Sequence, residues 1–403
     1  MMNVCRRRAT VVGLASLGVV GAGLGRRQAF AAPPAVQPPT MATPSRTEEI
    51  TMGEAFNVTG NLDPAMEAFL TAPPQPDVRE ASNMWFWDDE GRIGGPRIAV
   101  EAWGRNWDNR MVRLNLAFPD GRVLDATMLA PGHPDRADRF GAGPLVFECL
   151  EPFRRWKMTY DGPGRWATVK SQLAGEPSAG PDTHVVLNLE AEMAAAPYLR
   201  GAMNPQAADI IKNHPDGLMV GRGYNIKHLF RCTGRFQAGD ERIEIRGGGL
   251  RVRRRGVRDA SQLRGHCWQS ALFPSGRAFG MTCFPPRPDG GPSYNEAFVH
   301  LNGRVIPARV VEAPWMTTFE SPKNLSFVLE TAKGPISIDG RDCASTFTRH
   351  LDDLSSLLGA RMRGGAEGLP FHQGIARYRW DGEEAIGMVE RSYPSDATRS
   401  DGA

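Results

Sequence analysis

Residues 112–118, Val-Arg-Leu-Asn-Leu-Ala-Phe, are followed by Pro119-Asp120-Gly121 and then by residues 123–129, Val-Leu-Asp-Ala-Thr-Met-Leu. Apolar side chains occupy every second position from 112 to 118, which is the period of a strand with one buried face. Pro-Asp-Gly is a typical turn sequence, and two such runs around a short turn predict a β-hairpin. This stretch therefore indicates a β-rich fold.

The same pattern recurs along most of the chain. The 403 residues include 45 glycines and 32 prolines, as a fold of many short strands and turns requires. We expect a turn at Asp161-Gly162-Pro163-Gly164. Two helices are predicted, a short one at Asp63–Leu70, where Asp63 caps a helix that starts with a proline, and one over Ser345–Leu358. The prediction is an all-β fold with few short helices.

A weak internal repeat divides this β-rich region. Phe118-Pro119-Asp120-Gly121-Arg122 is matched by Phe273-Pro274-Ser275-Gly276-Arg277 in the second half, and each lies between strand-like segments. Tyr160-Asp161-Gly162 and Trp380-Asp381-Gly382 occur late in the two halves. The repeat favours a duplicated β-domain, with the first copy over residues 82–215 and the second over residues 216–393.

The N-terminus has the pattern of an export signal. Arg6-Arg7-Arg8 precede an uncharged run from Ala9 to Gly25, and Ala29-Phe30-Ala31 offers a small-residue cleavage site. Residues 1–31 thus predict export by the twin-arginine route to the periplasm or beyond. An uncleaved membrane anchor and a cytoplasmic protein are the alternatives. We expect a disordered linker over 32–48, an N-terminal extension over 49–81 and a disordered tail over 394–403.

Charge and cysteine content exclude some classes of protein. The formal charge of +3 includes the five arginines of residues 1–31 and becomes −2 without them, so we expect no nucleic-acid partner. Five cysteines remain after the signal, widely spaced and without a CxxC pair, which leaves at least one free thiol. The sequence does not determine the oligomeric state.

His266-Cys267-Trp268 and Tyr294-Asn295-Glu296 hold the densest proton-transfer chemistry of the chain. On strands, His266 and Trp268 share one face and Tyr294 and Glu296 share another. We predict that His266 and Glu296 exchange protons, that Tyr294 donates a hydrogen bond, and that Trp268 shields a cationic intermediate. The alternative is that all four are ordinary residues of half-buried strands.

Further candidates are ligand-binding residues. Arg251 and Asp259 are predicted at the rim of a cavity, although a charged edge strand explains the same arginines. Glu148 and Trp156 are candidates to line a cavity of the first domain. His300 shares a strand face with Glu296, but no spaced set of metal ligands exists, and we expect no metal and no cofactor.

Three further stretches of the chain carry a family resemblance: residues 147–156 (Phe-Glu-Cys-Leu-Glu-Pro-Phe-Arg-Arg-Trp), the Gly247–Arg251 stretch and Gly387-Met388-Val389-Glu390-Arg391. They resemble the carotenoid hydratase (hydroxyneurosporene synthase) and AttH-like group. The group's H-x-W looks matched by His266 and Trp268, and its Y-x-D by Tyr294 and Glu296. The chain departs from the group in carrying Glu for Asp, and in the six residues between Asp259 and His266. The resemblance implies two tandem lipocalin-like β-barrels.

The resemblance also implies a chemistry. A carboxylic acid, here Glu296, would protonate an alkene, Trp268 would lie beside the carbocation, and water would add. We therefore expect an exported enzyme that hydrates, dehydrates or isomerises a hydrophobic, isoprenoid-like or lipid-like molecule, with peripheral membrane contact as a further expectation. The alternatives are a non-catalytic carrier of such a ligand and an interaction protein with a solid core.

Overall fold

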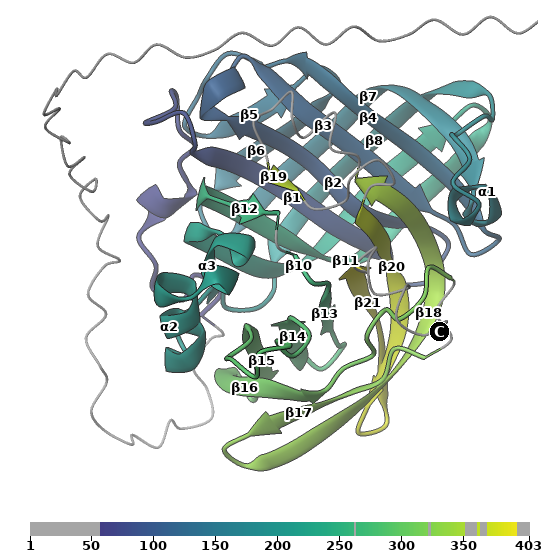
Figure 1. Ribbon diagram of the computed structural model, residues 1–403. Helices are drawn as coiled ribbons and strands as arrows, with labels where there is room; N and C mark the ends of the chain where they lie inside the picture. The colour runs from purple at the N-terminus through teal and green to yellow at the C-terminus, as the bar shows by residue number, and fades with distance from the viewer. Residues whose placement is uncertain (1–56, 262, 321–323, 351–360, 363–368, 393–403) are drawn as a thin grey trace, which may run out of the picture. The chain divides into compact units, whose positions relative to one another are not determined.

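The computed structural model describes residues 57–392, apart from residue 262 and the segments 321–323, 351–360 and 363–368. Its strands form two closed antiparallel barrels of eight strands each. Figure 1 shows the arrangement of these strands. The all-β, tandem-barrel prediction is thereby confirmed. The predicted export signal, the linker and the tail lie outside the described residues.

The first barrel closes through the pairing of β4 with β7. Its strands are β1 (Arg79–Asp88), β2 (Gly94–Trp103), β3 (Asn109–Ala117), β4 (Arg122–Pro131), β7 (Arg155–Thr168), β8 (Asp182–Met193), β10 (Arg222–Ala238) and β11 (Glu241–Val257). Three shorter strands extend it, β5 (Arg139–Ala142), β6 (Leu145–Glu151) and β9 (Tyr198–Leu199).

The second barrel follows in chain order. Its strands are β13 (His266–Leu272), β14 (Ala278–Cys283), β15 (Asn295–Leu301), β16 (Arg304–Glu312), β17 (Phe327–Thr331), β18 (Gly334–His350), β20 (Leu369–Trp380) and β21 (Glu383–Ser392). A parallel pair, β12 (Asp259–Ala260) with β19 (Arg361–Met362), stands apart from both barrels. The helices are η1 (Pro64–Glu67), η2 (Gly104–Asn106), α1 (Val169–Leu173), α2 (Pro205–Asn213) and α3 (Pro215–Val220).

The two F-P-x-G-R stretches form the same turn. Phe118 N donates to Arg122 O at 3.1 Å, and Phe273 N donates to Arg277 O at 2.8 Å. Gly121 and Gly276 both have a positive φ, of 83° and 87°, which favours glycine at this place. Each turn joins two strands of one barrel, as the predicted hairpins require.

Four predictions differ from the observed elements. Residues 161–164 continue β7 and make no turn, whereas Asp381-Gly382 turn between β20 and β21, so that part of the repeat is not structural. Residues 345–350 belong to β18, because Thr346 and Phe347 pair across the ladder with β20; residues 351–358 lie outside the described residues. The first barrel extends beyond residue 215 to Val257, since β10 pairs with β8 and β11 pairs with β1. The predicted helix at Asp63–Leu70 is the shorter η1, capped by Asp63.

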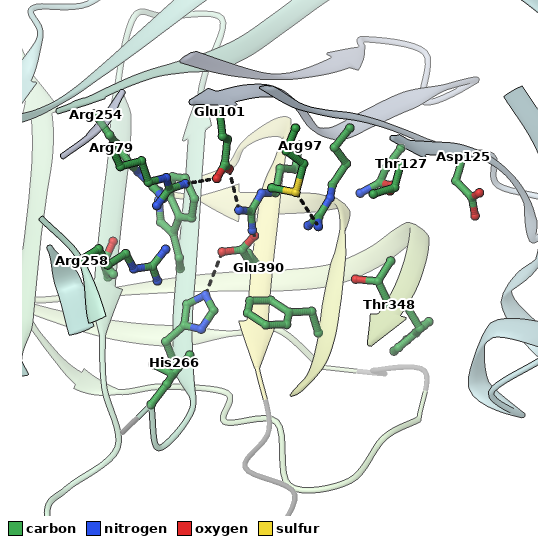
Figure 2. A pocket seen from close by; sticks show the side chains of 18 of the residues that line it. Arg79, Arg97, Glu101, Asp125, Thr127, Arg254, Arg258, His266, Thr348 and Glu390 are labelled. Carbon is green, nitrogen blue, oxygen red and sulfur yellow. Dashed lines mark hydrogen bonds and ion pairs between the residues drawn. The ribbon is translucent and has the colours of Figure 1, made fainter. Parts of the chain in front are cut away.

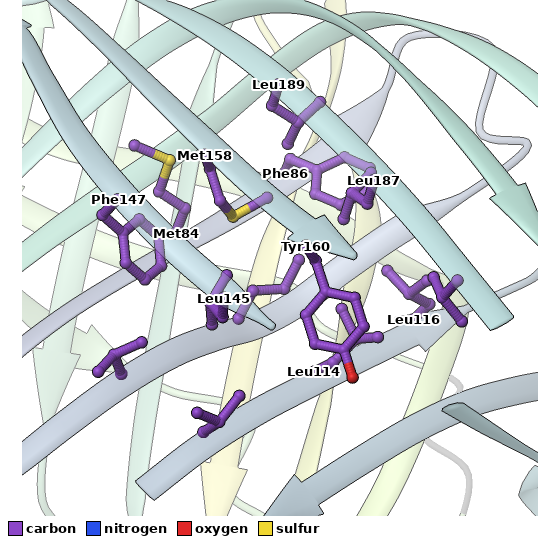
Figure 3. Close-up of a cluster of buried hydrophobic side chains, with 14 of the residues drawn as sticks. Met84, Phe86, Leu114, Leu116, Leu145, Phe147, Met158, Tyr160, Leu187 and Leu189 are labelled. Atoms are coloured by element: carbon purple, nitrogen blue, oxygen red, sulfur yellow. The ribbon is translucent and has the colours of Figure 1, made fainter. Parts of the chain in front are cut away.

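Each barrel has its own apolar core. Figure 3 shows part of the first, where Met84, Phe86 and Leu114 meet side chains of β6, β7 and β8. In the second barrel, Phe279 packs against Phe327 and Tyr378. Apolar side chains thus line the interiors of both barrels.

The two barrels pack against each other through outer faces. Trp85 and Trp87 of β1 and Leu250 of β11 form one cluster with Trp268 of β13 and Met388 of β21. The rings of Trp85 and Trp268 meet edge to face with centroids 5.6 Å apart. Because side chains alternate along a strand, the residues two positions away from these on the same strands also face the partner barrel. This interface carries the site described below.

All five cysteines of the described residues are free thiols. Among the described residues, no helix combines the length and apolarity that crossing a membrane requires.

Candidate active site between the two barrels

A cavity of about 640 Å³ lies between the barrels. Side chains of β1, β2, β3, β10 and β11 line it from the first barrel, and side chains of β13, β14, β18, β20 and β21 line it from the second. Figure 2 shows how Arg79, Arg97, Glu101, His266 and Glu390 converge in it. The predicted His266 and Trp268 face this cavity between the barrels, outside the core of the second barrel.

A bulge in β2 directs Arg97 into the cavity. The register against β3 shifts between Gly94 and Ala99, and Arg97 has a φ of 61°. Such a conformation costs a residue other than glycine about 1–3 kcal/mol, and strained residues of this kind concentrate at functional sites. Arg97 Nη2 donates to Glu101 Oε1 at 3.1 Å, and its Nη1 lies 3.7 Å from Glu390 Oε2. The strain thus places one guanidinium between two buried carboxylates.

Glu101 is the centre of a buried ion cluster. Arg79 Nη2 lies 2.5 Å from its Oε2, and Glu101 is 1% exposed. Burial alone would raise the pKa of Glu101, but the charges of Arg79, Arg97 and Arg113 outweigh it and hold the pKa well below the usual range. Glu101 is therefore ionised, and its carboxylate is ion-paired with Arg79 and Arg97.

His266 and Glu390 form a buried pair at the centre of the cavity. His266 Nε2 donates to Glu390 Oε1 at 2.9 Å, and Ser392 Oγ lies 2.6 Å from His266 Nδ1. Burial opposes ionisation of Glu390, but the hydrogen bond from His266 and the charge of Arg97 lower its pKa to about 2. An ionised carboxylate only accepts hydrogen bonds, so the proton of the imidazole stands on Nε2.

A chain of amide groups connects Glu390 to the first barrel. Gln373 Nε2 of β20 donates to Glu390 Oε2 at 2.5 Å, and Asn115 Nδ2 of β3 donates to Gln373 Oε1 at 3.1 Å. Both oxygens of Glu390 are thus hydrogen-bonded, one from each side. This fixes the carboxylate and, through it, the plane of the His266 ring.

The expected contact between His266 and Glu296 is replaced by two separate pairs. Both ring nitrogens of His266 are bonded as described, while Tyr294 OH donates to Glu296 Oε2 at 2.5 Å. Gly201 N donates to Glu296 Oε1 at 2.7 Å. Tyr294 lines the cavity and Glu296 does not, so the phenol stands between the carboxylate and the cavity. Burial, and then the charge of Glu296, raise the pKa of Tyr294 well above its ordinary value.

Lys227 of β10 crosses from the first barrel to Trp268. Its Nζ lies 5.2 Å from the centroid of the indole and donates to Thr282 Oγ1 at 2.6 Å. Burial lowers the pKa of Lys227 to about 7, although the charge of Glu296 opposes this. The amine therefore exchanges a proton near neutral pH. Trp268 forms the predicted aromatic wall of the cavity.

The predicted ligand-binding residues lie elsewhere. Arg251 and Trp156 are buried inside the first barrel, where the guanidinium stacks 4.2 Å from the indole centroid and pairs with Glu67. Glu148 is half-buried on β6, opposite Lys157. None of these residues lines the inter-barrel cavity.

The other two candidates are also outside the cavity lining. Asp259 on β12 accepts from Ser261 N at 2.9 Å. His300, 1% exposed, meets Phe298 edge to face, and burial lowers its pKa to about 4. Within the described part of the chain, no three His, Cys, Asp or Glu side chains are placed to hold a metal ion.

Four charged side chains of the cavity lining were not predicted as site residues from the sequence. Arg97, Glu101, Lys227 and Glu390 are isolated charges in strand-like segments, and no spacing connects them. Glu390 stands in the Gly387–Arg391 stretch that resembles the AttH-like group, which is the one signal that singles it out. Only the pairing of β21 with β13 brings it to His266.

The fold is similar to that of several solved structures. CghA matches with 10% identity, covering 80% of this chain and 89% of its own at a TM-score of 0.52, and CghA with Sch210972 matches equally at 0.53. A putative AttH from Nitrosomonas europaea is similar at 13% identity, covering 86% of this chain and 98% of its own, with a TM-score of 0.49. At such identities the likeness concerns the fold alone. Among curated proteins, none matches this chain in sequence.

One family model covers both barrels. It matches residues 68–394, which include every strand from β1 to β21. The chain belongs to the family described as a domain of unknown function, DUF7064.

Proposed function

We propose that the cavity between the barrels is the active site of a cofactor-independent enzyme that moves protons on an unsaturated, largely hydrophobic small molecule. The observation that carries the proposal is the His266–Glu390 pair, which shares one cavity with an amine that titrates near neutral pH. Catalytic acids and bases work best when their pKa lies near the working pH. Hydration, dehydration and isomerisation all need two such groups.

The geometry supports distinct roles for the two groups. In a dehydration, the neutral amine of Lys227 takes a proton from carbon, the double bond forms, and the C–O bond breaks. The leaving oxygen takes the place of Ser392 Oγ at His266 Nδ1, takes up a proton from that nitrogen and departs as water; hydration is the reverse. Glu390 positions the imidazole and stabilises its charge, since it is ionised and bonded at Nε2. Trp268 lies under Lys227, where its π face also stabilises positive charge on a substrate.

A non-catalytic carrier is the second candidate, because the same cavity is large enough for a small organic molecule. The similar CghA fold has been crystallised with Sch210972, which supports a ligand site in this fold for either candidate.

The experiment that separates these candidates starts with the lipophilic extract that co-purifies with the protein, identified by mass spectrometry. The compound is then incubated with the protein in D₂O. An enzyme incorporates deuterium at carbon, or changes the mass of the compound by one water. A compound recovered unchanged at every enzyme concentration would refute the catalytic proposal and favour a carrier.

Lys227 carries a prediction on pH. Its pKa of about 7 is below the ordinary 10.5, so between these values the unfolded chain holds a proton that the folded chain has released. The free energy of unfolding therefore rises with pH across this window, and the rise is absent from Lys227→Met. Urea unfolding of both proteins from pH 6 to pH 10 measures the difference. A difference that stays constant over this range would contradict the lowered pKa.

A further inference from the structure

The cavity carries an excess of positive charge. Six arginines and one lysine line it, against four carboxylates. The basic residues are Arg79, Arg97, Arg113, Arg200, Lys227, Arg254 and Arg258, and the acidic ones are Glu101, Asp125, Glu176 and Glu390. A purely hydrophobic ligand gives no reason to place so many cations around one cavity, since burying unpaired charge is costly.

The carboxylates nearest to the arginines are already engaged. Glu101 is paired with Arg79 and Arg97, and Glu390 accepts from His266 and Gln373. Asp125 lies with Thr127 and Thr348 at the opposite end of the cavity in Figure 2. Glu101 and Glu390 are therefore both already hydrogen-bonded or ion-paired to protein side chains.

In the described part of the chain, Arg200, Arg254 and Arg258 line the cavity without an ion pair, and Arg200 donates to the carbonyl oxygens of Val220 and Gly221. Arg258 Nε donates to Met219 O at 2.8 Å, and Arg254 lies 5.5 Å from the centroid of the Trp268 ring. Arg254 Nε is buried without a hydrogen-bond acceptor. Burial, and then the nearby arginines, lower the pKa of Arg258 to about 9 and that of Arg254 well below its ordinary value. Both guanidiniums line the cavity close to His266 and Glu390 (Figure 2).

Apolar groups surround the same end. The indoles of Trp103 and Trp268 and the ring of Phe284 line the cavity, and the ring of Phe371 lies 5.5 Å from that of His266. A guanidinium binds a carboxylate or a phosphate through two parallel hydrogen bonds, which fixes the direction of the bound group.

We infer that Arg254 and Arg258 bind an oxyanion of the ligand, so that the substrate is an amphipathic molecule with a carboxylate or phosphate head and an apolar body. The head lies beside the His266–Glu390 pair, and the body lies along Trp103, Trp268 and Phe284. Calling this molecule a substrate rests on the proposed function. If the protein is a carrier, the same description applies to its ligand. It adds an anionic group to the hydrophobic, isoprenoid-like or lipid-like ligand expected from the resemblance.

The test compares two dyes that differ by one anionic group, 8-anilino-1-naphthalenesulfonate and N-phenyl-1-naphthylamine. We expect the full-length protein to bind the sulfonate at least about tenfold more tightly, a difference of about 1.4 kcal/mol. In the Arg254→Gln, Arg258→Gln double variant, the sulfonate affinity falls about tenfold and the affinity of the neutral dye stays within about twofold. Equal affinities in the wild type, or a preference that survives in the double variant, would overturn the inference.

Controls separate the anion site from folding and from catalysis. The Arg377→Gln, Arg379→Gln double variant makes the same chemical change on β20, where both side chains are at least half exposed. It is expected to keep the preference for the sulfonate over the neutral dye. Arg254→Lys with Arg258→Lys keeps the charges and most of the preference, which excludes simple misfolding. Displacement of the sulfonate by acetate or by inorganic phosphate identifies the head group, and displacement by neither counts against the inference.

The outcome is independent of the proposed reaction. Glu390→Gln is expected to keep the preference for the sulfonate. If deuterium is exchanged but the sulfonate is not preferred, the protein is an enzyme that acts on a neutral substrate and the anion site is refuted. If the sulfonate is preferred but no deuterium is exchanged, the protein is a carrier of an anionic ligand and the proposed reaction is refuted.

Discussion

Glu390→Gln is expected to lower turnover by about 10²–10⁴-fold, the usual contribution of one positioned acid–base group. The carboxylate accepts from His266 Nε2 at one oxygen and from Gln373 Nε2 at the other. A carboxamide offers one acceptor and one donor, so one of these contacts is lost, and the charge that stabilises a protonated His266 disappears with it. Deuterium incorporation into the co-purified compound, measured per unit time, gives the effect.

A glutamate on the same strand provides the matched control. Glu383, at the start of β21, accepts from Ser275 and Arg277 at a hairpin that does not line the cavity. Glu383→Gln is expected to keep turnover within about twofold. Glu296→Gln tests the acid predicted from the sequence, which Tyr294 separates from the cavity. A larger loss in Glu296→Gln than in Glu390→Gln would reverse the assignment of the two carboxylates.

Trp156→Ala is expected to lower the free energy of unfolding by about 3–5 kcal/mol, as removal of a fully buried aromatic ring usually does. Trp156 has no exposed surface and meets Phe69 edge to face with centroids 5.8 Å apart. The guanidinium of Arg251, paired with Glu67, stacks on its other side. The substitution opens a void next to a buried charge, so the loss lies at the upper end of this range.

Affinity for the co-purified ligand is expected to be unchanged in Trp156→Ala at temperatures where the variant is folded, because the ring lies inside the first barrel and not in the cavity. Urea unfolding and ligand titration of the same samples measure both quantities, and Trp156→Phe serves as the milder control. A stability change below about 1 kcal/mol together with lost ligand affinity would place the ligand in the first barrel, as the sequence suggested.

The fold was accessible from the sequence because its signals are local. Alternation from Val112 to Leu129 and the turn at Pro119-Asp120-Gly121 depend on neighbours in the chain, and the hairpin of β3 and β4 follows from them. The boundary of the first barrel was not accessible in this way. It depends on the pairing of β11 with β1, whose residues lie far apart in the sequence.

Only part of the site could be predicted from the sequence, for the same reason. His266 and Trp268 are two residues apart on one strand, and this spacing correctly placed them on one face. The carboxylate partner of His266 could not be inferred, since β21 pairs with β13 only after the second barrel closes. Lys227 reaches Trp268 from the other barrel, so its lowered pKa is a property of the packed interface. Arg97 depends on a bulge and a positive φ that its neighbours, Gly94-Gly95-Pro96, only hint at.

The most direct test is a crystal structure of the protein with its co-purified ligand. We predict ligand density in the cavity between the barrels, with the anionic group within hydrogen-bonding distance of Arg254 or Arg258 and the unsaturated carbons beside His266 and Lys227. Ligand density enclosed within either barrel, with the space around the His266–Glu390 pair holding only water, would contradict it.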